Sequence, residues 1–297
     1  MTTGAYEQYT SACARSSGRI IDAYSTSFGW AVRLLGRRHR QHVRNVYGLV
    51  RVADELVDGV GSEAGLSGPE QLEQLARLEE DCSDAIRSGY SSNPVVHAFA
   101  DTARRCGIDE TTVRPFFASM RSDVPAPGAQ STAVRSLSPE DHEDYVYGSA
   151  RVVGLMCLRV FTRDEHLSDT ERRTLEHSAG ELGAAFQNVN FLRDFADDSQ
   201  RLGRDYLGVE AHLDREERDR WIRIIRAQLR NARRALPLLP RDARRAVRAA
   251  LDLFAELTRR IADTPPESLQ QRRVRVPGAV KGLILVGAVV RTALERR

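Results

Sequence analysis

The stretch Gln187-Asn-Val-Asn-Phe-Leu-Arg-Asp-Phe-Ala-Asp-Asp198 decides the fold of this chain, and it runs on to Gly203-Arg-Asp-Tyr206. Four oxygen-bearing side chains follow one another at steps of three, four and four residues, so on a helix they share one face: Gln187, Asn190, Asp194 and Asp198. Apolar residues point elsewhere and are expected to pack into the core: Val189, Leu192, Phe195 and Ala196. The stretch therefore predicts an amphipathic helix that carries a row of oxygen atoms.

This row of side chains suits a hard divalent cation. Mg²⁺ is bound in proteins through oxygen ligands, commonly one or two carboxylates, with water and substrate phosphates completing the shell. Asn190 adds a neutral oxygen, and Arg193 offers a planar fork for a phosphate. A single pair of acids also has a simpler interpretation, because acidic residues four apart on a helix are commonly just a solvated face.

A second acidic helix earlier in the chain favours the metal interpretation. The stretch Tyr47-Gly-Leu-Val-Arg-Val-Ala-Asp-Glu-Leu-Val-Asp58 places a comparable row on one helical face: Tyr47, Arg51, Asp54 or Glu55, and Asp58. Two such helices facing one another would hold several Mg²⁺ ions between them. Unpaired acids opposed across a core would be costly, and metal with diphosphate would neutralise them.

These two stretches resemble the phytoene/squalene synthases, the all-helical head-to-head branch of the isoprenoid synthases. That family carries Tyr-x-x-x-Arg-x-x-Asp-(Asp/Glu)-x-x-Asp early in the chain. Later it carries Gln-x-x-Asn-x-x-Arg-Asp-x-x-x-Asp, followed by Gly-Arg-x-Tyr. Both patterns match in order and separation, and the resemblance extends from Ser25 to about Lys281. It implies an all-α isoprenoid-synthase bundle with a central cavity, built as a single domain over residues 1–297.

The resemblance also implies roles for individual residues. Two or three Mg²⁺ ions would be held by Asp54, Asp58, Asn190, Asp194 and Asp198. The catalytic set would comprise the four acids with Tyr47 and Arg51. The substrate would be bound by Ser25, Ser27, Phe28, Tyr145, Arg151, Gln187, Asn190, Arg193, Arg204, Tyr206, Phe254, Arg272, Arg273 and Lys281. Phe254 stands where many relatives have Tyr, so a hydroxyl is missing there. Ser25 or Ser27 would also cap the helix that follows, and the two roles are compatible.

A long helix is expected from Pro139 to Phe161, with small residues at 148, 149, 150 and 154. Two interpretations have equal weight. The small residues either allow close helix packing, or they give room to an isoprenoid tail, as in the matching helix of the family. Arg151 stands where much of the family has a small residue. Its guanidinium would either face the tail cavity and shorten it, or face outward as a surface group.

Composition narrows the class of protein. Of 297 residues 41% are hydrophobic and 29% are charged, typical of a soluble globular chain. A net charge of +3 does not by itself indicate nucleic-acid binding. The four cysteines lack metal or disulfide spacing, which predicts reduced thiols and a cytoplasmic protein. The longest apolar stretch, from Gly282 to Val290, falls short of the roughly 20 residues that span a bilayer.

The remaining chain reads as helices joined by loops, with no strand-like alternation. A basic turn with exposed His39 and His42 is expected at 37–44, a loop at 60–69, and a linker from Val124 to Thr132. Helices are expected at 6–24, 30–35, 69–88, 95–106, 115–123, 214–235, 241–262 and 280–297. The last is apolar on one side, so contact with a membrane surface is an option if the product is an apolar hydrocarbon.

The predicted reaction begins when an allylic isoprenyl diphosphate ionises, assisted by Mg²⁺. An aromatic wall of Phe28, Tyr47, Tyr145, Phe186 and Phe191 would keep water from the allylic cation. The family default for the acceptor is a second allylic diphosphate, joined head to head. The alternative is an aromatic acceptor such as a carbazole that receives a short dimethylallyl group. A third class, an Arg-rich scaffold or nucleic-acid binder, is disfavoured because clustered acids repel phosphates.

Overall fold

Helices make up nearly all of the chain in a computed structural model that describes residues 4–25, 27–124, 134–200, 202–210 and 212–295. The first half contains α1 (Ala5–Tyr24), α2 (Ser27–Arg33), α3 (Arg37–Val57), α4 (Val60–Glu63), α5 (Gly68–Ser88), α6 (Pro94–Cys106) and α7 (Glu110–Ser122). The second half contains α8 (Pro139–Val146), the π-helical turn η1 (Tyr147–Arg151), α9 (Val152–Thr162), α10 (Asp169–Gln200), α11 (Arg215–Arg234), the 3₁₀ turn η2 (Leu236–Leu238), α12 (Arg241–Ala262), α13 (Pro266–Leu269) and α14 (Gly278–Leu294). The all-α prediction is confirmed. Apart from Val124, the predicted linker lies outside the described residues.

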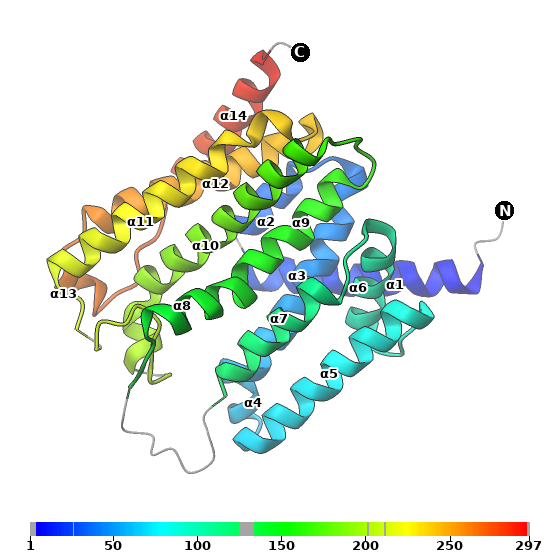
Figure 1. Ribbon diagram of the computed structural model, residues 1–297, viewed down its shortest axis with the longest axis horizontal. Coiled ribbons are helices and arrows are strands. Elements are labelled where there is room, and N and C mark those ends of the chain that lie inside the picture. The colour runs from blue at the N-terminus through cyan, green and yellow to red at the C-terminus, as the bar shows by residue number, and fades with distance from the viewer. Residues whose placement is uncertain (1–3, 26, 125–133, 201, 211, 296–297) are drawn as a thin grey trace.

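The 32-residue helix α10 is the axis of the bundle. It packs against α9, α11, α12 and η1, while α3 packs against α1, α6, α7 and α9. Figure 1 shows α11, α10, α9 and α7 running side by side, with α14 at the edge of the molecule. One cluster of buried apolar side chains extends through the described chain from Ile21 to Leu269. Among the described helices, none combines the length and apolarity needed to cross a bilayer.

Three glycines hold η1 and α9 against their neighbours. A Cβ at Gly148 would overlap the carbonyl oxygen of Pro115 in α7, and one at Gly183 would overlap the carbonyl oxygen of Ala150. Gly154 meets α10 at equally short range. Close helix packing therefore explains Gly148, whereas Ser149, Ala150 and Gly154 also line the central cavity. Of the two interpretations of these small residues, close helix packing applies to Gly148, and room in the cavity applies to Ser149, Ala150 and Gly154.

The predicted turn at 37–44 is wrong, because α3 is one continuous helix from Arg37. His39 is buried rather than exposed, with its ring nitrogens at 3.1 Å from the carbonyl oxygen of Val160 and 3.2 Å from Asp242. His42 is half-buried and contacts the hydroxyl of Thr102 at 2.9 Å. Burial lowers the pKa of His42 to about 4. His39 and His42 are buried or half-buried because they contact residues of other helices, and the local sequence does not reveal such contacts.

A pair of two-residue strands is the exception to the helical pattern. β1 (Arg135–Ser136) pairs in parallel with β2 (Arg204–Asp205). The carboxylate of Asp205 accepts hydrogen bonds from the backbone N–H groups of Leu207 and Val209 at 3.1 and 2.8 Å. These bonds fix the turn after α10, and with it the positions of Arg204 and the residues that follow it.

Candidate active site

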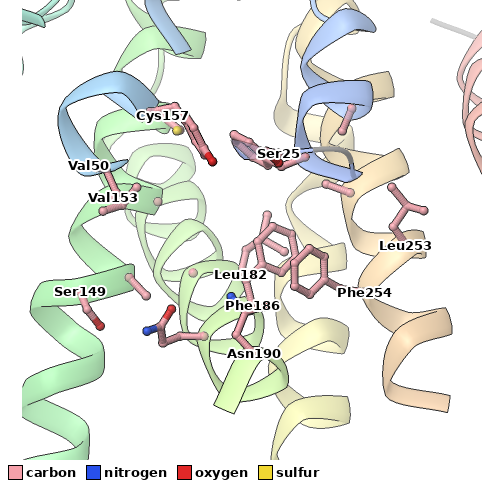
Figure 2. A pocket seen from close by; sticks show the side chains of 18 of the residues that line it. Ser25, Val50, Ser149, Val153, Cys157, Leu182, Phe186, Asn190, Leu253 and Phe254 are labelled. Carbon is pink, nitrogen blue, oxygen red and sulfur yellow. The ribbon is translucent and has the colours of Figure 1, made fainter. Parts of the chain in front are cut away.

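Both acidic stretches open into one cavity of about 910 Å³. Its wall comes mainly from α2, α3, α9, α10 and α12 and from the segment 273–276 before α14. Asp54 and Asp58 of α3 line it together with Asp194 and Asp198 of α10. The two acidic helices thus face a common space, as their repeated spacing predicted. Figure 2 shows part of this cavity, with the side chain of Asn190 directed into it.

Burial and crowding alter the protonation of these acids. Burial, and then the neighbouring Asp58, raise the pKa of Asp54 to about 8. Burial, and then the charges of Asp194 and Asp58, raise the pKa of Asp198 to about 8. The raised pKa values of Asp54 and Asp198 mean that nearby positive charges do not fully compensate the negative charge of the four carboxylates. The cavity end that holds these four acids therefore favours cations.

Arginines supply part of that positive charge. Arg51 contacts Asp54 at 2.7 Å. Arg193 donates two hydrogen bonds to the carboxylate of Asp194, and the Nε of Arg193 lies 2.9 Å from Oδ1 of Asp194. Arg273, from the segment before α14, reaches the same Oδ1 with its own Nε at 2.7 Å. Asp194 therefore forms ion pairs with Arg193 of its own helix and with Arg273 from the segment before α14.

Asn190 offers an oxygen atom that lacks a partner. Its Oδ1 is buried and accepts no hydrogen bond within the described residues. Over the same residues, no three His, Cys, Asp or Glu side chains lie close enough together to hold a metal ion by themselves. The oxygens available are thus mixed: carboxylates from two helices and one amide. Carboxylates and amide carbonyls are oxygen ligands of the type that a hard divalent cation accepts.

A cluster of positive charge lies beside the acids. Arg193, Arg273, Arg275 and Lys281 all line the cavity. Burial, with the charges of Arg275 and Arg193, lowers the pKa of Lys281. Within the described chain, neither Arg275 nor Lys281 pairs with an acid. This cluster is suited to a polyanion such as a diphosphate. Arg275 was not among the residues predicted to bind substrate, although its spacing of two from Arg273 in an extended segment was an available signal.

Tyr206 lines the cavity, whereas Arg204 lies behind the lining and supports it. Arg204 pairs with Asp58 and donates to the carbonyl oxygens of Val57 and Asp123 at 2.8 and 2.9 Å. The buried carboxylate of Asp123 accepts hydrogen bonds from the hydroxyls of Tyr145 and Tyr206, both at 2.7 Å. Burial raises the pKa of Asp123 to about 6 although Arg204 opposes this. Asp123 was missed, because a lone acid before a linker has no distinguishing pattern.

Aromatic rings cover much of the cavity wall. Phe28 stacks on Tyr47 with 5.8 Å between ring centroids, and the Arg51 guanidinium lies over Tyr47 at 5.9 Å. The rings of Phe191 and Tyr206 stack at 4.4 Å. Phe186 stacks on Phe254 at 3.7 Å. All five aromatic residues predicted for the wall line the cavity. Ser25 and Gln187 line it as well.

Some predicted residues are not brought to the cavity. Arg151 is absent from its lining, because its guanidinium pairs with Glu181 at 2.8 Å and Glu143 at 3.0 Å. Of the two orientations left open for Arg151, the structure shows the one directed away from the tail cavity. Arg272 is exposed and does not line the cavity, whereas its neighbour Arg273 lines the cavity with a side chain that is still half-exposed. The side chain of Ser27 lies outside the described residues.

Comparisons with known proteins agree with this geometry. The chain is 29% identical over 277 residues to a phytoene synthase of Arthrospira platensis, covering 86% of this chain and 85% of that protein. It is 29% identical over 291 residues to a 15-cis-phytoene synthase of a Paracoccus species, covering 92% and 90%.

Solved structures show the same fold. A dehydrosqualene synthase bound to a ligand matches with a TM-score of 0.70 at 21% identity, covering 98% of both chains. A squalene synthase of Alicyclobacillus acidocaldarius matches with a TM-score of 0.68 at 20% identity, covering 89% of this chain and 98% of that one. A family model described as squalene/phytoene synthase matches residues 21–279. The chain therefore belongs to the squalene/phytoene synthase family, whose members are prenyltransferases.

Proposed function

We propose that this protein joins two allylic isoprenyl diphosphates head to head and releases diphosphate. The observation that carries the proposal is the shared cavity: two acidic helices and a basic cluster stand beside an aromatic and aliphatic chamber. The charged part suits the diphosphate, and the apolar part suits the prenyl tail. Relatives named phytoene synthase, which cover most of this chain, support the assignment.

The residues present fit a magnesium site. Two or three Mg²⁺ ions would be held by Asp54, Asp58, Asn190, Asp194 and Asp198, and the partnerless Oδ1 of Asn190 supports this set. Bound Mg²⁺ stabilises the negative charge that develops on a leaving diphosphate. Because Arg51, Arg193 and Arg273 now contact Asp54 and Asp194, a cation there would compete with guanidinium groups for the same oxygens.

The arginines themselves recognise the leaving group. Arg193 and Arg273 meet at Asp194, so a diphosphate at this point would receive donors from both. Arg275 and Lys281 add charge that has no acidic partner in the described chain. These cations stabilise the negative charge on the bridging oxygen as the bond between C1 and oxygen breaks. The Ser25 hydroxyl lines the same cavity and is a further donor.

The apolar wall protects the allylic cation that remains. The face of Tyr47, stacked on Phe28, and the faces of Phe191 and Phe186 present π electrons to the cavity. The C2–C3 double bond of the second substrate attacks C1 of the cation, and a cyclopropane closes as one proton passes to the released diphosphate, directly or through the Tyr47 hydroxyl. The cyclopropyl product keeps the second diphosphate, and its departure, with opening of the ring and loss of a second proton, gives the hydrocarbon. Exclusion of water from this step prevents hydrolysis of the cation to an alcohol.

Transfer to an aromatic acceptor is the other activity to test. The guanidinium of Arg151 does not line the tail cavity, so it does not shorten the cavity in favour of a small dimethylallyl donor. Phe254 lacks the hydroxyl of the Tyr that many relatives have at this position, and this difference is compatible with an allylic diphosphate or an aromatic acceptor.

One incubation series tests the proposed function. We expect the purified protein with Mg²⁺ to release diphosphate from geranylgeranyl or farnesyl diphosphate alone and to form a hydrocarbon from two prenyl units. The reaction should stop in EDTA and resume when Mg²⁺ is added in excess. Diphosphate release and mass spectrometry of the products are the measurements. Turnover that appears only when dimethylallyl diphosphate and a carbazole are supplied together would overturn the head-to-head assignment.

We also propose that α14 rests on an anionic membrane surface. Its outward face carries Leu283, Val286, Val290 and Leu294, which are 73, 62, 49 and 75% exposed and recur at steps of three, four and four. An exposed apolar stripe of this kind marks an interaction surface. The chain carries a formal net charge of +3, which favours an anionic over a neutral lipid surface.

Vesicle sedimentation tests this contact. We expect the protein to sediment with phosphatidylglycerol vesicles and much less with phosphatidylcholine vesicles, because both apolar burial and charge contribute. Exchange of Leu283, Val286 and Leu294 for serine should release it from the vesicles. The same exchanges at Tyr6 and Tyr90, exposed residues on other helices and loops, serve as the control. Unchanged sedimentation of the α14 variant would contradict a membrane partner. So would light scattering that shows the wild type to self-associate and the α14 variant to be a monomer, because α14 would then contact a second copy of the chain.

A further inference from the structure

The ring pair Phe186–Phe254 joins two helices inside the cavity. Phe186 comes from α10 and Phe254 from α12, and their rings stack with centroids 3.7 Å apart and planes 17° apart. Figure 2 shows both rings projecting into the open space, with Val50 and Val153 on the opposite wall. Both side chains are only partly buried, because they face the cavity rather than the core.

The pair lies at mid-depth along the cavity. Asp194, at the acidic end, is eight residues from Phe186, or about 12 Å along the helix axis at 1.5 Å per residue. Leu175, which also lines the cavity, is eleven residues away in the other direction, or about 16 Å. On α12, the lining likewise continues toward the helix start, to Ala246. A prenyl chain whose diphosphate lies at the acids must therefore pass the two rings to reach the far end.

Beyond the rings the wall includes several small side chains among larger ones such as Leu175 and Leu239. Ala179 and Gly183 of α10 line this part, as do Ala232, Ala246 and Ala250 of α11 and α12. These residues leave room, whereas the two phenyl rings occupy it. The two rings therefore stand between the acidic end of the cavity and a deeper part that has room for more prenyl chain.

We infer that the Phe186–Phe254 pair is the constriction that sets the length of the prenyl chain this enzyme accepts. The inference rests on the proposed function and adds the specificity of the same site. A stacked pair resists displacement better than a single ring, because each ring loses the contact with its partner if it swings aside. Long chains must either displace the pair or bend toward Val50 and Val153.

A structural role is the competing explanation. The pair joins α10 to α12, so its loss would also loosen the contact between these helices. Loosening would lower turnover of short and long donors together. A constriction, by contrast, changes the ratio between donors, because removing a ring favours only the chain that needs the space.

The experiment compares kcat/KM for geranyl and geranylgeranyl diphosphate in the wild type, Phe254→Ala, Phe186→Ala and Phe254→Tyr, with thermal midpoints recorded for each. We expect both alanine variants to raise the geranylgeranyl-to-geranyl ratio at least about tenfold, since one methylene in an apolar pocket changes selectivity by about 10-fold or more. Phe254→Tyr keeps the ring and should keep the wild-type ratio. An unchanged ratio in both alanine variants, whatever their stability, overturns the constriction while leaving the proposed function in place. A wild type that releases no diphosphate from any allylic donor overturns both.

Discussion

Replacing Asp194 with alanine is expected to lower the rate of diphosphate release by about 10²–10³-fold or more. The carboxylate lines the cavity, contributes to the proposed magnesium site and receives both Arg193 and Arg273. Its loss removes a ligand for the cation and leaves two guanidinium groups to reorient. Loss of a single electrostatic element of this kind costs about 2.7–4 kcal/mol of transition-state stabilisation. Release of inorganic diphosphate at saturating donor is the measurement.

Asp197→Ala is the matched control for that experiment. Asp197 lies on the same helix and is exposed, and it does not line the cavity. Its replacement by alanine removes the same charge as the replacement of Asp194. Its variant is expected to retain most of the wild-type rate and to need the same concentration of Mg²⁺. If Asp194→Ala kept more than about a tenth of wild-type turnover, or if both variants lost activity equally, a special role for Asp194 would be excluded.

Replacing Asp123 with alanine is expected to destabilise the protein by about 3–5 kcal/mol. This buried carboxylate accepts hydrogen bonds from two phenols and lies 3.7 Å from a guanidinium nitrogen of Arg204. Without it, the hydroxyls of Tyr145 and Tyr206 lose an acceptor in a place that water reaches poorly. Activity should fall as well, since Arg204 also fixes Asp58. The urea midpoint, measured with far-ultraviolet circular dichroism, reports the change in stability.

The amide variant separates charge from hydrogen bonding. Asp123→Asn keeps a carbonyl oxygen that can accept from one phenol, so its loss of stability is expected to be clearly smaller than that of alanine. A midpoint for Asp123→Ala within error of the wild type would show that the two tyrosines find other partners. The bracing role of this carboxylate would then be excluded.

The parts of the site that could be predicted are those encoded by helical spacing. Asp54, Asp58, Asp194 and Asp198 repeat at intervals that force one face, so their convergence followed from two stretches of sequence. Helix ends marked by Asn93 or Ser138 were similarly close to the expected positions, because these residues cap the first turn.

The rest depends on contacts between residues far apart in the chain. Asp123 joins Tyr145 and Tyr206 across 22 and 83 residues, and no local pattern announces such a link. The orientation of Arg151 could not be decided from the sequence, because its partner Glu181 lies 30 residues away on α10. The π-helical turn inserts extra backbone within the expected helix, so the direction of each following side chain differs from an ideal helical count.

The clamped turn η1 also bears on how this protein would respond to redesign. Its position is held by backbone-to-backbone approach at Gly148 and Gly183, not by the side chains that face the chamber. Exchanges at Ser149 or Val153 would alter the lining while the scaffold stays seated, whereas even one methyl group added at either glycine would push the helices apart. The glycines that fix the helix packing are thus different residues from Ser149 and Val153, which line the cavity. The lining residues are therefore the positions at which substitutions could change the terpene product while the fold is kept.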